Sequence, residues 1–104
     1  MTNLLHARLD PSLSARVLAR RPLLYAAGPD TADDRPAHVR AGSALAWLGG
    51  RLAIVQDDTN FVAFVRPWRG EVSFLTLPAG PGGKRQFDDG RGNKRHKLDL
   101  EAST

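Results

Sequence analysis

The sequence predicts an all-β fold organised around a meander of four antiparallel strands within residues 44–77. Three turn signals cut this stretch into short apolar runs that start near residues 44, 51, 61 and 71. Gly49-Gly50 is a hairpin signal, because glycine readily takes the positive φ angles of primed turns. Asp-Asp-Thr-Asn at 57–60 and Pro-Trp-Arg-Gly at 67–70 have typical turn composition. Because each turn joins two short runs, consecutive strands are expected to pair with each other.

Both faces of the two middle strands are apolar in the sequence. In the second run, Leu52 and Ile54 share one face while Ala53 and Val55 share the other, and the run at 61–65 has the same character. A sheet that is buried on both faces needs a further layer above and below it. A β-propeller meets this need, because each four-stranded blade packs between its neighbours. A small β-sandwich or barrel, with the N-terminal segment over one face, is the alternative.

Length and composition limit these possibilities. A chain of 104 residues makes one domain but not a whole propeller, so we expect either a fragment of a β-propeller or identical chains that supply the other blades. The absence of cysteine excludes a disulfide scaffold and a cysteine-ligated zinc site. No apolar run has transmembrane length, and the N-terminus lacks the features of a signal peptide. The expected location is cytoplasmic, with no membrane partner.

The chain before the meander divides into an N-terminal segment, 1–26, and a loop with its lead-in, 27–43. Alternation at 14–25 favours a strand that would complete a blade of a closed ring. A helix capped by Asp10 is the alternative for this segment. The loop carries three carboxylates, which are predicted to be solvated turn residues rather than metal ligands: Asp30, Asp33 and Asp34.

Residues 78–97 form a glycine-rich basic loop. Its cations are candidates for attracting an anionic substrate or the phosphates of a nucleic acid. They are Lys84, Arg85, Arg91, Lys94, Arg95 and Lys97. Phe87 is the one aromatic residue among them, so the loop lacks a platform for stacking bases. The net charge of +4 therefore does not make nucleic acid the expected partner.

The last segment, 98–104, is predicted to begin another blade. Polar and apolar residues alternate there, which places Asp99 and Glu101 on one face of a strand. Two neighbouring carboxylates can bind a hard cation or position a water, so these residues are the candidate metal ligands. An ordinary amphipathic edge strand, with both acids in water, is the alternative.

Two stretches, HVRAGSALAWLGGRLAIVQDD at 38–58 and FDDGRGNKRHKLDLEA at 87–102, resemble the N-terminal part of a family of uncharacterised bacterial proteins. That family is expected to form β-propellers and is distantly similar to phytase-like propellers. The resemblance implies one blade plus the opening of the next. Phytase-like propellers carry an Asp-x-Glu-Gly motif near calcium, and Asp99 and Glu101 match its acids, whereas Ala102 replaces the glycine.

Three classes of function follow, and the sequence does not decide whether the chain is part of an enzyme. The favoured class is a noncatalytic scaffold of propeller type that binds a small molecule or a protein, with the remaining blades or identical chains as partners. The second is a calcium-assisted, phytase-like phosphoesterase or esterase. The third is a basic nucleic-acid-binding domain. No complete catalytic set is present in the sequence, so the isolated chain is expected to be inactive.

Overall fold

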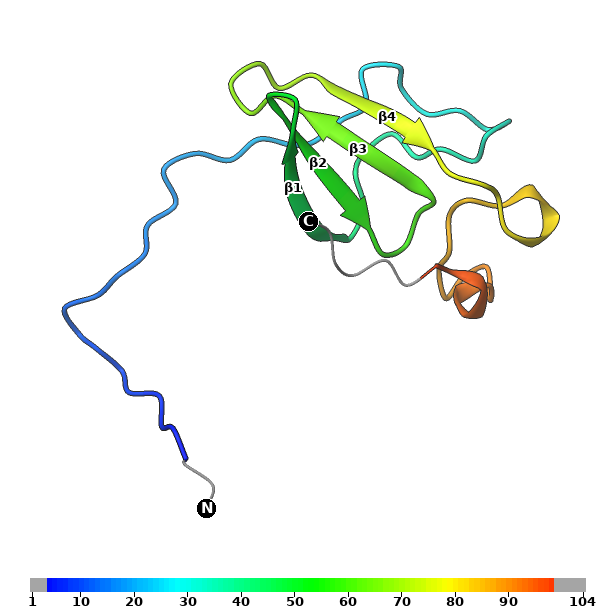
Figure 1. The fold of residues 1–104 in the computed structure, drawn as a ribbon. Coiled ribbons are helices and arrows are strands. Elements are labelled where there is room, and N and C mark those ends of the chain that lie inside the picture. The colour runs from blue at the N-terminus through cyan, green and yellow to red at the C-terminus, as the bar shows by residue number, and fades with distance from the viewer. Residues whose placement is uncertain (1–3, 99–104) are drawn as a thin grey trace.

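The computed structural model describes residues 4–98 and confirms the all-β prediction. Four strands form one antiparallel sheet in the order β1-β2-β3-β4, which is a meander (Figure 1). The strands are β1 (Gly42–Leu48), β2 (Arg51–Gln56), β3 (Phe61–Val65) and β4 (Val72–Thr76). Two short 3-10 turns, η1 (Pro81–Gly83) and η2 (Lys94–His96), follow the sheet. The described part of the chain contains no α-helix.

The predicted turns join the strands as expected. Gly49 and Gly50 both have positive φ, at 58° and 78°, as a primed hairpin turn requires. Gly70 has a φ of 74° and closes the β3–β4 turn by donating its N–H to the carbonyl of Arg66. These local choices fix the register, because a hairpin loop of given length sets which residues face each other.

One face of the sheet forms the core. Ile54, Ala63 and Val72 are buried there against Tyr25, which comes from the segment before β1. The Tyr25 hydroxyl accepts a 2.8 Å hydrogen bond from Nε2 of the buried Gln56. Burial of the phenol raises the pKa of Tyr25, although the bond from Gln56 opposes this shift. Residues before β1 therefore supply the layer over this face.

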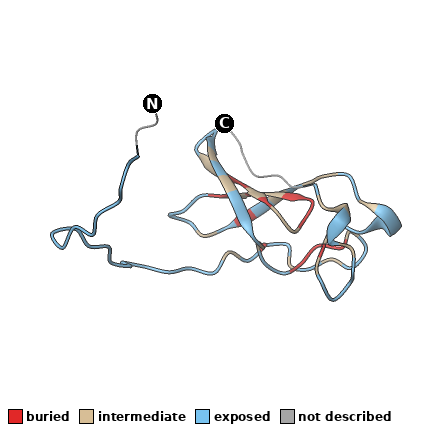
Figure 2. Cartoon of the chain, turned by 90° about the horizontal axis from the view of Figure 1, so that it is seen from below, coloured by how far each residue is buried: buried red, intermediate tan, exposed pale blue. Residues whose placement is uncertain are grey.

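The other face of the sheet is more open. Cross-strand pairs Val55–Val62 and Val62–Leu75 run across it, and none of these three side chains belongs to the buried core cluster. Leu75 is 53% exposed. Both faces are apolar, as the sequence predicts, but the buried core cluster takes its strand members from one face. Figure 2 shows that the buried residues are concentrated in and beneath the sheet.

The strand predicted over 14–25 is wrong. Only Leu24 and Tyr25 form bridges, each isolated, with His38 and Val72 respectively. Residues 4–22 form no strand and lead away from the sheet as an exposed arm (Figures 1 and 2). The capped helix is absent as well. The Asp10 carboxylate instead accepts hydrogen bonds from the amide and hydroxyl of Ser12 in a single turn.

Candidate functional site

The basic loop packs against the end of the sheet that holds the β2–β3 turn. Thr59 and Gln86 form an antiparallel bridge, and the Phe87 amide donates to the Asp58 carbonyl. Phe87 is fully buried, lying against the backbone of Gly80. The aromatic residue of the loop is thus an anchor for the loop and offers no surface for stacking a base.

A buried carboxylate organises this loop. Asp34 accepts five hydrogen bonds through its two oxygens: from the amides of Arg85 and Gln86, from the Gln86 side chain, and from both terminal nitrogens of Arg91. The shorter contact to Arg91 is 2.7 Å. Asp34 has a φ of 54°, in the left-handed region that aspartate tolerates better than most residues. The prediction that Asp34 is a solvated turn residue is wrong.

The charge on Asp34 is stabilised where it lies. Burial by itself raises the pKa of this carboxyl, but the hydrogen bonds from Arg91 and from the two backbone amides outweigh burial. The net effect holds the pKa of Asp34 well below its usual range. The same hydrogen bond raises the pKa of Arg91. The pair stays ionised and ties the loop 27–43 to the loop 78–97.

The other two acids of the first loop behave as turn or surface groups. Asp30 accepts hydrogen bonds from the amides of Ala32 and Asp33, as a turn carboxylate does. Asp33 lies 3.5 Å from the Arg85 guanidinium. No group of three or more acidic or histidine side chains placed to hold a metal occurs within residues 4–98. The predicted calcium ligands Asp99 and Glu101 lie outside the described residues.

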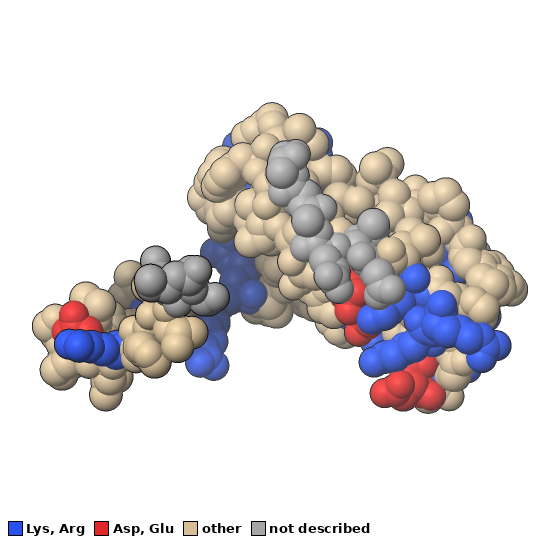
Figure 3. All heavy atoms as spheres, turned by 60° about the horizontal axis from the view of Figure 1, so that its bottom comes forward, with Lys and Arg blue, Asp and Glu red and all other residues tan. Residues whose placement is uncertain are grey.

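Most of the predicted anion-attracting side chains are paired with carboxylates. Arg85 and Arg91 bind the acidic loop as described. Lys97 lies 3.0 Å from Asp57, and Lys94 lies 3.7 Å from Asp89. Figure 3 shows the basic side chains gathered on this surface with acidic side chains on their flanks. Lys84 and Arg95 make no ion pair with any residue that the structure describes. The structure brings Arg85 and Arg91 together beside the acidic loop, and much of the positive charge of the six is compensated within the chain.

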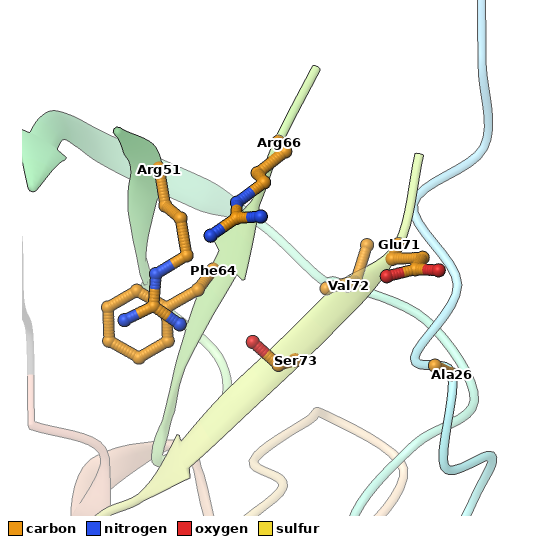
Figure 4. Close-up of a pocket in the computed structure, with 7 residues that line it drawn as sticks. All are labelled: Ala26, Arg51, Phe64, Arg66, Glu71, Val72 and Ser73. Carbon is orange, nitrogen blue, oxygen red and sulfur yellow. The ribbon is translucent and has the colours of Figure 1, made fainter. Parts of the chain in front are cut away.

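The opposite end of the sheet holds a pocket that the sequence analysis did not identify. Its volume is about 230 Å³. It is lined by Ala26, Arg51, Phe64, Arg66, Glu71, Val72 and Ser73 (Figure 4). The Arg51 guanidinium lies over the Phe64 ring, 4.6 Å from its centroid. Arg66 enters from the end of β3, and the Ser73 hydroxyl comes from β4.

Both tryptophans are exposed beside this end. Trp47 on β1 and Trp68 in the β3–β4 turn stack with ring centroids 6.5 Å apart and an interplanar angle of 18°. They are 64% and 65% exposed, although aromatic rings of this size are usually well buried. Together with Leu45 and Leu48 they give the β1 edge an apolar surface. Monomeric proteins rarely leave such an apolar surface exposed to water.

Comparison with known proteins finds no matching family model, curated protein or solved structure. Within the described residues there is no helix long and apolar enough to cross a bilayer.

Proposed function

We propose that the chain is a noncatalytic β-propeller-type unit, one four-stranded blade that buries its open surfaces against further β-structure. The meander with a half-open apolar face is the observation that carries this proposal. A blade in a ring packs on both sides, and its neighbours supply the layer that a single blade lacks. The remaining blades of the same propeller, or identical chains, are the partners that fit.

The exposed apolar residues support this proposal. The open face presents Leu75 and Leu48, and the β1 edge adds the stacked tryptophans. The arm contributes a further exposed set: Leu4, Leu5, Leu9, Leu13, Val17 and Leu18. Monomeric proteins rarely leave so many large apolar side chains in water, because each buried one stabilises an assembly by about 1.5–3 kcal/mol. These residues fit an arm and a sheet that pack against other chains or blades.

The two other classes of function have less support. A nucleic-acid interface on the 84–97 loop needs free cations, and Arg85, Arg91, Lys94 and Lys97 are engaged with carboxylates. A calcium-assisted phosphoesterase rests on Asp99 and Glu101 and on the resemblance alone. We therefore place binding and assembly ahead of catalysis.

Two leucines allow a matched test. Leu75 lies on the open face and is 53% exposed, while Leu24 lies in the covering segment and is 54% exposed. Leu75→Lys should weaken self-association of the full chain, measured by sedimentation velocity, and should reduce binding of the neutral dye Nile red. Leu24→Lys should change neither property. A chain that sediments as a monomer and binds no dye would contradict the proposal.

A further inference from the structure

We propose that the pocket between Arg51 and Arg66 binds a small oxyanion, a phosphate group or a carboxylate. Its lining residues Phe64 and Ser73 lie on the open face of the sheet, so blades that cover this face would also enclose the site. It lies at the end of the sheet opposite the basic loop, so it uses none of the cations that the sequence singles out.

The sheet register brings the two arginines together. Leu52 faces Val65 across β2 and β3, so Arg51 and Arg66 occupy the next facing position. Like charges directly opposite each other on one face destabilise a sheet unless something compensates them. In Figure 4 both side chains project from the same side of the sheet into the pocket region. An oxyanion between them removes this repulsion.

Neither guanidinium is compensated by the protein. Within residues 4–98, neither Arg51 nor Arg66 makes a side-chain hydrogen bond or an ion pair. The Arg51 guanidinium makes a cation–π contact with the Phe64 ring. Glu71 lines the same pocket and lies opposite Arg66, one position beyond the Val65–Val72 pair, yet it forms an ion pair with neither arginine. The donors of both arginines are therefore available to a ligand.

The remaining lining residues define the ligand class. Guanidinium groups present planar sets of N–H donors that match the oxygens of phosphates and carboxylates. The Ser73 hydroxyl adds another donor at the edge of the space. A volume of about 230 Å³ suits one such group with a small substituent, since sites for drug-sized ligands start near about 300 Å³. Phe64 holds Arg51 in position, which lowers the entropy lost on binding.

Glu71 gives the site a repulsive element. Its carboxylate faces the same space as the two arginines, so it weakens anion binding without abolishing it. Replacing Glu71 with glutamine should therefore tighten anion binding. If the anion were attracted only nonspecifically to the basic chain, neutralising any other acidic residue would tighten binding by the same amount.

Titration of the full chain with inorganic phosphate, followed by amide chemical shifts in NMR spectra at low ionic strength, tests the site. We expect saturable shifts at the pocket residues. Arg51→Gln and Arg66→Gln should each raise the Kd by about tenfold, as the loss of a charge-assisted hydrogen bond predicts. Glu71→Gln should lower it by about threefold. A parallel titration with acetate shows whether the carboxylate or the phosphate is preferred.

Arg95→Gln is the control, because Arg95 is exposed, lies in η2 beyond the opposite end of the sheet and changes the net charge by the same amount. It should leave the Kd within about twofold of the original value. Thermal melts verify that each variant is folded, and Arg66→Gln is informative on its own because Arg66 is exposed. Equal losses in Arg66→Gln and Arg95→Gln overturn the proposal. So does the absence of saturation by both anions below about 10 mM.

Discussion

The two ends of the sheet use their arginines in opposite ways. At the end that holds the β2–β3 turn, Nη1 of Arg91 lies 2.7 Å from Oδ2 of the buried Asp34, and Arg85 lies 3.5 Å from Asp33. At the other end, Arg51 and Arg66 line a pocket with no carboxylate partner among the described residues. The first pair holds loops together, and the second is free to meet a ligand.

This difference shows that the number of charges in a segment does not locate a binding surface. The loop 78–97 has the densest positive charge in the sequence, yet acids from the loop 27–43 and from the β2–β3 turn neutralise much of it. A charged side chain that already forms an ion pair within the chain attracts an external partner less strongly. The pairing of each side chain, rather than its count, separates a structural cluster from a candidate site.

The largest expected effect is the loss of the Asp34 carboxylate. Asp34→Asn keeps a residue that tolerates positive φ but removes the charged carboxylate, whose two oxygens accept five hydrogen bonds. We expect the free energy of unfolding to fall by about 3 kcal/mol, because asparagine keeps only one of the two acceptor oxygens and has no negative charge to face Arg91. Urea unfolding measures this change. Asp89→Asn is the control, because the Asp89 side chain is 92% exposed and its pair with Lys94 contributes little.

Acid should reproduce part of this loss. The pKa of Asp34 is depressed in the folded state, so its contribution to stability is fully present above the unfolded value of about 3.9 and is lost as pH falls towards the folded pKa. Melting temperatures between pH 6 and pH 2 should therefore drop more steeply below about pH 4 in the original chain than in Asp34→Asn. Identical acid limbs for the two proteins would show that Asp34 is not the group responsible.

The strands could be predicted from sequence because their signals are local. Gly49, Gly50 and Gly70 each take the positive φ that their turns require, and these turns define the meander. The strand expected over 14–25 failed because alternation alone does not make a strand. A strand also needs partners for its backbone groups, and among residues 14–23 only the Leu23 carbonyl has one within the described chain, the amide of Val39.

The candidate sites were harder to predict because they join distant positions. Asp34 and Arg91 are 57 residues apart, and no periodicity links them. The pocket depends on the register between β2 and β3, which places Arg51 beside Arg66. Part of that signal was present in the sequence: both arginines flank predicted turns, so strict pairing of the second and third runs would have brought them together.

A smaller effect is expected from removing the ring beneath Arg51. Phe64→Leu keeps an apolar side chain on the half-buried face but abolishes the contact at 4.6 Å between the guanidinium and the ring centroid. We expect phosphate to bind about twofold to fivefold more weakly, since the cation–π contact contributes about 0.5–1 kcal/mol to placing Arg51. The same NMR titration measures it. Val62→Ala is the control, because Val62 lies on the open face but does not line the pocket. Phe74→Leu is unsuitable, because Phe74 packs against the core.

Calcium should have the smallest effect. The resemblance to phytase-like propellers nominates Asp99 and Glu101, but Ala102 replaces the motif glycine, and the described residues supply no cluster of further ligands. Two carboxylates alone leave most of the six to eight oxygen positions of calcium to water, so binding should be weak. We expect the melting temperature of the full chain to be unchanged by millimolar calcium. A rise that disappears in Asp99→Asn/Glu101→Gln would instead support the calcium-assisted hydrolase, and it would move the functional centre from the Arg51–Arg66 pocket to the last residues of the chain.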